Sequence, residues 1–597
     1  SSLFAGTRDN GGDSGNMFIQ TKRLVGERGA QIAANSEPGT PGAAGKITIL
    51  ASESVELDNP TTYPGGKPTG IYTFASNDND GGELFIDTKR FTVRGGTSVS
   101  TVTSGSGDAG NIVINASEFM EVSGVSPFNG GLSRVRARTS GIGDGGDITI
   151  TTGRLTVKDG GLISAESDPN STGKAGNLII EKADLVEVIG TSPDGQSASK
   201  LFLDSEGTGD AGSFNIDTRK LLVQDGGQVS ANTSGRGQAG ILNVDASESV
   251  EVIGTSSNGQ FRSQLIFDSS GTGNAGELTV NTSQLFIQDG GQVSATTSSL
   301  GLGGTLDVDA ADSTVISGTN GQFNSRLIFE SNGAGDARGI TLNTGDLTVE
   351  NGGQITVGGT GAGESGNLDI TANRIFLANQ GQLQATTQAV RGGNIGLQVR
   401  DYILMRFGSE ISAEAFGVSD GGNIFLLDTP FVIAILSENS DVVAGAELGQ
   451  GGAIFAPNTK ASFFREFNGF RTPESDFTAD SQIPGLEGVV DAQRLDQTTE
   501  PFPEDFQEQE VTQACQAGQN SENRGRSTFI NRGRGGLPPQ PNAPLGGSSI
   551  EIELNNFPQR EEQSEVEDED ATNKIKNPVV VTENNEFGCG LEFHSYP

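Results

Sequence analysis

The sequence predicts an all-β protein, a parallel β-helix of about 16 coils with three strands in each coil. Three observations lead to this fold class. A glycine-marked apolar motif recurs at a nearly constant period, the segments between the markers alternate apolar and polar residues, and no helical period separates them. A chain with this pattern stacks its turns, because a single turn cannot bury its own apolar side chains.

The marker is a small residue, usually glycine, followed by one variable residue and then by an apolar-x-apolar run. It occurs 16 times, from Gly15 to a weak last copy at Gly488, and Arg338 holds the glycine position in one copy. Consecutive markers lie 27 to 37 residues apart, and short and long units alternate over most of the chain. Almost the same stretch therefore returns after 64 residues, at 221–244 and 285–308.

Each unit is expected to hold three short strands. In the unit that begins at Gly276 they are ELTV (277–280), QLFI (284–287) and QVSATT (292–297), separated by the turn segments NTS and QDGG. Long units add about eight residues between the second and third strands, which should form a ridge of loops in every second coil. A β-propeller is the alternative, but its blades need four strands and about 40 or more residues.

Composition narrows the classes of function. The chain has 597 residues, of which 88 are glycine, and its net charge is −38. This negative charge argues against a nucleic-acid partner, because affinity for a phosphate backbone depends on cationic side chains. No apolar run reaches about 18 residues, so the sequence predicts no transmembrane segment.

The end of the sequence differs from the repeats. The marker fades after about residue 493, so we expect the rod to occupy 1–498 and a largely disordered, acidic tail to occupy 499–597. Both cysteines, Cys515 and Cys589, lie in this tail and are candidates for a disulfide. The only histidine, His594, is expected to be a tail residue without a catalytic role.

Several segments carry a family resemblance. Besides the glycine-marked coils, they are SENSDVVAGAELGQGGAIFA (437–456), ESDFTADS (474–481), TQACQAG (512–518) and RGRGGLPPQPNAPL (532–545). Together they resemble large cyanobacterial filamentous-haemagglutinin-like proteins, which are exoproteins of two-partner secretion systems. The resemblance implies a right-handed β-helix outside the cell, exported by an outer-membrane partner transporter and acting in adhesion, aggregation or a surface coat. The family's NPNG-like secretion motif is absent from this sequence.

We therefore expect an extracellular or cell-surface rod, associated with the outer membrane, that acts as an adhesin without catalysis. Its expected partners are cell-surface glycans or neighbouring cells. Two alternatives stay open, a polysaccharide-active β-helix enzyme and a purely structural surface-layer spacer. Glycoside hydrolysis needs two carboxylates that flank the scissile bond, and we find no Asp–His or Asp–Arg cluster that interrupts the repeat.

Calcium is the one cofactor that the sequence brings into question. Asp159, Asp225 and Asp289 hold the same place in DGG corners, and Asp108, Asp144 and Asp210 precede markers. Ca²⁺ takes six to eight oxygen ligands, whereas equivalent DGG aspartates fall about two coils, or about 9.6 Å, apart. We interpret the aspartates mainly as turn residues and keep Asp159, Asp225 and Asp289 as weak Ca²⁺ candidates.

Overall fold

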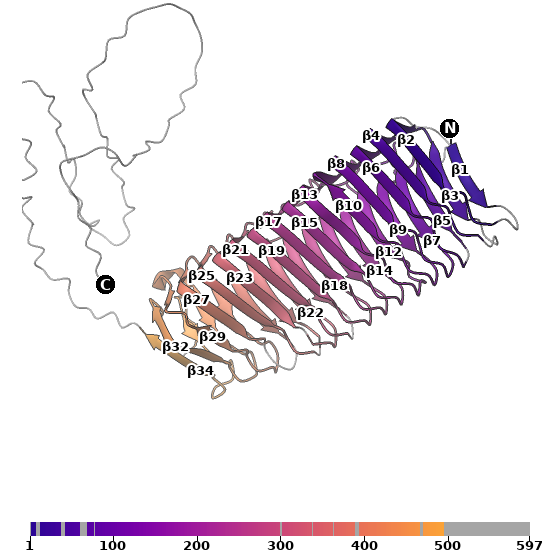
Figure 1. Ribbon diagram of the computed structural model, residues 1–597. Helices are drawn as coiled ribbons and strands as arrows, with labels where there is room; N and C mark the ends of the chain where they lie inside the picture. Colours follow the sequence, from indigo (N-terminus) through magenta and orange to yellow (C-terminus); the bar gives the residue numbers. More distant parts are fainter. Residues whose placement is uncertain are drawn as a thin grey trace, which may run out of the picture. The chain divides into compact units, whose positions relative to one another are not determined.

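The computed structural model describes residues 2–494, apart from 8–11, 37–41, 60–67, 77, 299–300, 337, 362, 389–392 and 466–469. Over these residues the chain is a parallel β-helix, as the sequence predicts, with two long parallel sheets (Figure 1). The expected tail, the boundary at 498/499, Cys515, Cys589 and His594 lie outside the described residues.

The first sheet, called sheet A here, contains 16 short strands, one from each coil, and every pair of neighbours is parallel. Its strands are β1 (Ser2–Thr7), β3 (Gln31–Ser36), β5 (Gly70–Ala75), β7 (Ser98–Thr103), β9 (Arg134–Thr139), β12 (Leu162–Ser167), β14 (Lys200–Ser205), β16 (Gln228–Thr233), β18 (Gln264–Ser269), β20 (Gln292–Thr297), β22 (Arg326–Ser331), β24 (Gln354–Gly359), β26 (Gln382–Thr387), β28 (Glu410–Ser412), β31 (Asp441–Val443) and β33 (Phe477–Thr478).

The second sheet, sheet B, contains longer strands. They are β2 (Met17–Glu27), β4 (Ile47–Asp58), β6 (Leu84–Arg94), β8 (Ile112–Ser123), β10 (Ile148–Thr152), β11 (Arg154–Lys158), β13 (Leu178–Ile189), β15 (Ser213–Gln224), β17 (Ile241–Ile253), β19 (Glu277–Gln288), β21 (Thr305–Ser317), β23 (Gly339–Glu350), β25 (Asn367–Ala378), β27 (Ile395–Met405), β29 (Ile424–Leu427), β30 (Phe431–Ile433), β32 (Ala453–Ser462) and β34 (Val489–Arg494). A single 3₁₀ turn, Leu436–Glu438, completes the described elements.

The strands of sheet B correct one expectation about the coil. The first two strands expected in each unit are joined in most coils into one strand, which has a register shift where the two halves meet, as between Thr218 and Lys220 of β15. Only two coils keep the halves apart, as β10 with β11 and as β29 with β30. The coil therefore has the three sides that the sequence predicts, but the corner between the first two is made without leaving the strand.

The core lies between the two sheets. In the coil of β19 and β20 the side chains of Leu278, Val280, Leu285, Ile287 and Val293 are fully buried. These are the apolar positions of the repeat, and every coil offers equivalent ones to the coil above and below. Alternation of apolar and polar residues thus fixes which side of each strand faces the core.

The marker glycines are required by close approach of the backbone. A methyl group added to Gly82, Gly276 or Gly422 would lie directly on the carbonyl oxygen of the preceding marker, Gly45, Gly240 or Gly393. None of these glycines has a positive φ. The coils can therefore stack at this corner only where the marker has no side chain.

In the copy where Arg338 holds the marker position, the close approach of the two coils is made possible by a glycine one residue later. Gly339, the next residue, has φ of 131°, a value that side chains strongly disfavour, and a methyl group added to Gly366 of the following coil would lie 2.8 Å from the Cα and N atoms of Gly339. The glycine has moved along the chain, but the corner still contains one.

The DGG corners use the conformational freedom of glycine. Asp225 and Asp289 have φ of 54° and 51°, and the glycines after them, Gly226 and Gly290, have φ of 91° and 92°. Two consecutive left-handed residues turn the chain from sheet B into sheet A. Aspartate and asparagine tolerate the first position better than most residues, which is why both occur there.

The inserted loops of the long coils form the predicted ridge. Each is closed by an isolated antiparallel bridge, such as Thr255 with Arg262. Loops two coils apart are joined, because Asn258 Nδ2 donates to Gly195 O at 3.0 Å and Asn320 Nδ2 donates to Thr255 Oγ1 at 2.9 Å. The ridge is therefore continuous over the three loops at 191–198, 255–262 and 319–324, although only alternate coils contribute to it.

The outer face of sheet A carries three rows of side chains, at the first, third and fifth positions of each strand. In the middle row, bulky residues of long coils alternate with small residues of short coils from β3 to β22. The row reads Ala33, Tyr72, Ser100, Arg136, Ser164, Phe202, Ser230, Ile266, Ser294 and Ile328. The small residues are 1 to 5% exposed, so they lie at the bottom of notches between bulky neighbours.

Two carboxyls in the last row predict how stability depends on pH. Burial raises the pKa of Asp204 to about 7 and that of Asp268 to about 6. Because both values exceed the unfolded value of about 3.9, the folded state binds more protons, and stability falls as pH rises from about 4 to 7. About 1.4 kcal/mol accompanies each pKa unit, and water still reaches these half-buried groups, so we expect about 1–2 kcal/mol from each. Thermal unfolding should show a higher Tm at pH 5 than at pH 8, and Asp204→Asn should reduce the difference.

Candidate functional site

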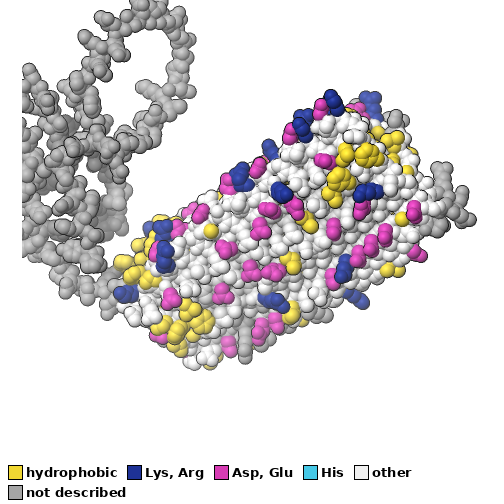
Figure 2. Space-filling model, viewed as in Figure 1, with side chains coloured by type: hydrophobic (Ala, Val, Ile, Leu, Met, Phe, Trp, Pro, Cys, Tyr) yellow, Lys and Arg dark blue, Asp and Glu magenta, His cyan; other side chains and the backbone are white. Residues whose placement is uncertain are grey.

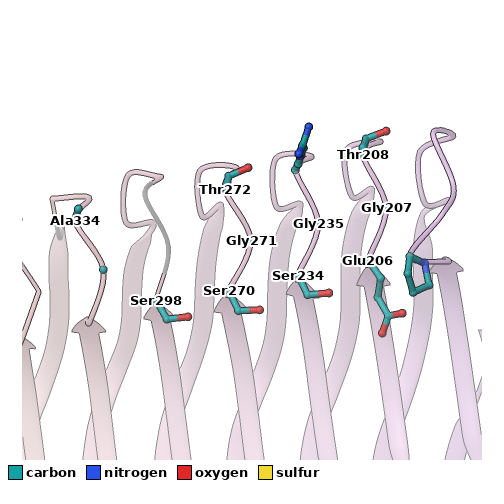
Figure 3. Close-up of a pocket in the computed structure, with 13 residues that line it drawn as sticks. Glu206, Gly207, Thr208, Ser234, Gly235, Ser270, Gly271, Thr272, Ser298 and Ala334 are labelled. Atoms are coloured by element: carbon teal, nitrogen blue, oxygen red, sulfur yellow. The ribbon is translucent and has the colours of Figure 1, made fainter.

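The candidate site is an open groove of about 550 Å³ along the turns that follow sheet A. It crosses the ends of successive coils, and Figure 3 shows those coils side by side. Its lining is Pro169, Glu206, Gly207, Thr208, Ser234, Gly235, Arg236, Ser270, Gly271, Thr272, Ser298, Gly333 and Ala334. The groove is therefore lined by hydroxyls and glycine backbone, with one acidic and one basic side chain.

The hydroxyls of the groove come from equivalent positions. Ser234, Ser270 and Ser298 each follow directly after a strand of sheet A, and Figure 3 shows them in a row with side chains pointing the same way. Their backbone N–H groups donate to the preceding coil, for example Ser270 N to Thr233 O at 2.8 Å. All three are exposed, and their hydroxyls make no hydrogen bond within the described chain. They are thus held in place by the backbone and left available for a ligand.

A second column of hydroxyls, at the residue before each of the exposed positions, is buried and bonds the backbone of the turn. Thr103 Oγ1 donates to Gly107 O at 2.7 Å and Ser205 Oγ donates to Gly209 O at 2.8 Å. These buried hydroxyls fix the shape of each turn from inside. The turn therefore presents its outer hydroxyls rigidly, because the inner ones already satisfy the turn backbone.

The aspartates before the markers also serve the stacking of coils. Asp108 Oδ1 accepts the N–H of Asp144 at 2.8 Å, Asp144 Oδ1 accepts the N–H of Lys174 at 2.8 Å, and Asp210 Oδ1 accepts the N–H of Gln238 at 2.9 Å. Each carboxylate bonds the equivalent residue of the next coil. Their oxygens are therefore engaged in the rod itself.

The three weak Ca²⁺ candidates lie in separate corners. Asp159, Asp225 and Asp289 have φ of 54°, 54° and 51° and occupy the left-handed position of their turns, as the turn interpretation requires. Among the described residues, no three carboxylate, thiol or imidazole side chains lie close enough together to hold a metal ion.

A second groove, of about 480 Å³, follows the bend of sheet B. Its polar side chains are largely used already. Asn281 Nδ2 donates to Asp245 Oδ1 at 2.7 Å, Ser283 Oγ donates to Ser247 O at 3.1 Å, and Arg219 pairs with Glu248 just outside the groove. It therefore has fewer groups to offer a ligand than the groove beside sheet A.

Sequence reasoning missed one cluster of charges. Arg471 lies on the segment before β33 and bonds Glu414 at 2.7 Å and Glu410 at 3.4 Å. Asp441, Asp476 and Asp480 also lie around it on the outer face of the last coils. The expectation that no Asp–Arg cluster interrupts the repeat was wrong, because its members come from three coils and an insertion and share no local spacing.

Two carboxyls of this Arg471 cluster have raised pKa values. Burial raises the pKa of Asp441 to about 6. Burial, followed by the charge of Glu414, raises the pKa of Glu410. A protonated acid beside an ionised one is what hydrolases use, but neither groove described above includes any of these carboxylates.

Comparison with known proteins gives no information about this site. No family model, curated protein or solved structure matches the chain. In the part of the chain that the structure describes, no helix is long and apolar enough to cross a membrane.

Proposed function

We propose that the chain is an adhesin-like rod that binds polyhydroxylated ligands, such as cell-surface glycans, in the groove beside sheet A and acts without catalysis. The observation that carries the proposal is the row of exposed, unbonded hydroxyls at Ser234, Ser270 and Ser298. Hydroxyls both donate and accept hydrogen bonds, so a row of them suits a ligand made of sugar hydroxyls.

The periodicity of the groove supports multivalent binding. Successive hydroxyls lie about 4.8 Å apart along the rod, so a linear polymer can contact several coils at once. No aromatic side chain lines the groove, so each contact is weak by itself. Affinity would then come from the number of contacts, which fits adhesion between surfaces that present many copies of a glycan.

The cellular setting belongs to the same proposal. The resemblance to filamentous-haemagglutinin-like exoproteins supports a place outside the cell or on the outer membrane and export by a partner transporter. The net charge of −38 supports a surface that repels nucleic acids and stays soluble. A polysaccharide-active enzyme and a structural spacer are the competing functions, and the following experiment separates them.

Removal of the hydroxyls that line the groove should weaken binding. The full chain would be tested on a glycan array and in a cell-adhesion assay, with release of reducing sugar followed in parallel. Thr208→Ala, Ser234→Ala and Ser270→Ala together are expected to weaken binding about tenfold or more, since each lost hydrogen bond contributes about 0.5–1.5 kcal/mol.

The matched control is Thr341→Ala with Thr371→Ala. Both are exposed on the outer face of sheet B, so they should leave binding unchanged. Release of sugar would favour the enzyme and point to the Arg471 cluster. A rod that binds no glycan and releases no sugar would favour the spacer.

A further inference from the structure

The outer face of sheet A, from β9 to β28, is uneven, because bulky and small side chains lie next to each other on it. From β9 to β22 its middle row alternates bulky and small side chains with a period of two coils, or about 9.6 Å, and beyond β22 the row continues with Thr356, Gln384 and Ser412. Serines such as Ser230 and Ser294 are 5% and 1% exposed. They form the floors of notches whose walls are the side chains of the neighbouring coils. A surface with this relief is complementary to itself when it is shifted by one coil.

The charges of this face are arranged unevenly along the rod. Strand β9 turns Arg134, Arg136 and Arg138 outward, and the first two have no carboxylate partner among the described residues. Burial, followed by the charge of Arg134, lowers the pKa of Arg136, although Glu166 and Asp168 act in the opposite direction. At the other end, the Arg471 cluster places four carboxylates, Glu410, Glu414, Asp441 and Asp480, around one arginine.

We propose that two copies of this chain pair through this face, antiparallel, about a two-fold axis that runs along the strands between β18 and β20. The arrangement sets bulky residues opposite small ones. Ile266 faces Ser294 of the second copy, Ser230 faces Ile328, and Phe202 faces Thr356. Ile266 and Phe202, which are only partly buried, would then meet smaller side chains of the other rod, which gives the close packing that a stable interface needs. Ile328 is itself only 4% exposed and protrudes little.

The same axis sets unlike charges opposite each other. Strand β9 lies five strands from the axis on one side and β28 lies five strands from it on the other. Arg134 then faces Glu410 of the second copy, and Arg138 faces Glu414. Glu410 and Glu414 are 19% and 28% exposed and both are already bonded by Arg471. The arginines of the second rod would therefore share these carboxylates with Arg471.

Between these ends, charged residues of one copy meet neutral residues of the other. Asp268 faces Thr296, Asp204 faces Gly358, and Lys200 faces Gln354. A two-fold axis along the rod would instead set bulky residues against bulky ones and serines against serines. Shape and charge both favour the antiparallel pair.

The size of the face is sufficient for a stable dimer. Ten strands about 4.8 Å apart, each with five residues about 3.3 Å apart, give a face of about 48 by 17 Å. A standard protein interface buries about 800 Å² on each partner. Pairing of this kind would let rods aggregate, in addition to the glycan binding proposed above. It does not use the groove, so the dimer test and the glycan-binding test can give different results.

The first test is the mass of the full chain by sedimentation equilibrium. We expect a dimer at micromolar concentration, and Arg134→Glu with Arg136→Glu should weaken it at least tenfold. Arg90→Glu, an exposed change on sheet B with only a long 4.0 Å pair to Glu118, is the control and should leave the dimer intact. A monomer at about 100 μM, or a dimer that the two β9 changes do not weaken, would overturn the proposal.

The second test fixes the register. Lys200→Cys and Gln354→Cys are made in separate chains that also carry Cys515→Ser and Cys589→Ser. The proposal places positions 200 and 354 of opposite copies about 10 Å apart, the spacing of facing sheets, and two copies of position 200 about 24 Å apart along the rod. A bismaleimide linker of about 10 Å should therefore join only mixed chains. Joining of Lys200→Cys chains to one another, or no joining of mixed chains, would contradict the antiparallel register.

Discussion

Gly276→Ala is expected to break the stacking of coils at the β19 corner. The new methyl group would lie on the carbonyl oxygen of Gly240 and 2.7 Å from Cζ of Phe267. Backbone atoms on both sides are fixed by the parallel hydrogen bonds of sheet B, so the coils can relieve the overlap only by moving apart. We expect a loss of about 3–5 kcal/mol, the range of severe core substitutions.

The loss should be local, because each coil contacts only its neighbours. Hydrogen exchange should become faster in the coils next to Gly276, and thermal unfolding should show an earlier step. Gly15→Ala is the matched control: it changes a marker of the same kind, but among the described residues its methyl group would meet only Cβ of Ala5, at 3.9 Å. Equal melting of the two variants would show that the corner can move and that the marker glycines are not required by space.

Arg471→Ala is expected to destabilise the last coils by about 2–4 kcal/mol, since removal of one partner leaves half-buried charges uncompensated. Glu410 and Glu414 would lose their ion pairs while Asp441 stays close by. Arg471 opposes the raised pKa values of Glu410 and Asp441, so without this cation both pKa values should rise further. Protonation would then neutralise them, so the loss should be larger at pH 8 than at pH 5.

Urea unfolding at both pH values, with hydrogen exchange over 405–480, would measure this effect. Arg471→Lys should recover part of the stability, because it restores the charge without the bidentate geometry. Arg400→Ala is the control, since the Arg400 side chain is 70% exposed and pairs only with its neighbour Asp401; it should cost less than about 0.5 kcal/mol. A loss for Arg471→Ala that does not depend on pH would mean that packing of the segment, and not its charge, is what Arg471 supplies.

The architecture could be predicted because nearly every unit contains a glycine marker at a similar spacing and strands in which apolar and polar residues alternate. Marker spacing gave the coils, and the inserted residues gave the ridge. The joined strands of sheet B could not be predicted, because NTS at 281–283 reads as a turn although β19 runs through it with only a shift of register. The sequence also did not distinguish marker glycines, needed for space, from DGG glycines, needed for positive φ.

The sites were harder to predict because their residues share no motif. The groove depends on which of two neighbouring hydroxyls points into the turn, as with Ser269 and Ser270, and only coordinates separate them. A serine after the third strand of several coils, as at Ser234, Ser270 and Ser298, was the available signal. The Arg471 cluster has no such signal, because stacking brings together residues that lie 27 to 70 positions apart in the chain.

The alternation of long and short coils sets the unit by which this rod can be lengthened. Ridge contacts join residues 63 and 65 positions apart, and the middle row of sheet A repeats over the same pair of coils. A duplication of one 28-residue coil would place like coils next to each other, interrupt the ridge and put two serines or two bulky residues side by side. A duplication of 64 residues would preserve all of these contacts, so growth or shortening of the gene by coil pairs is the change that this structure accommodates.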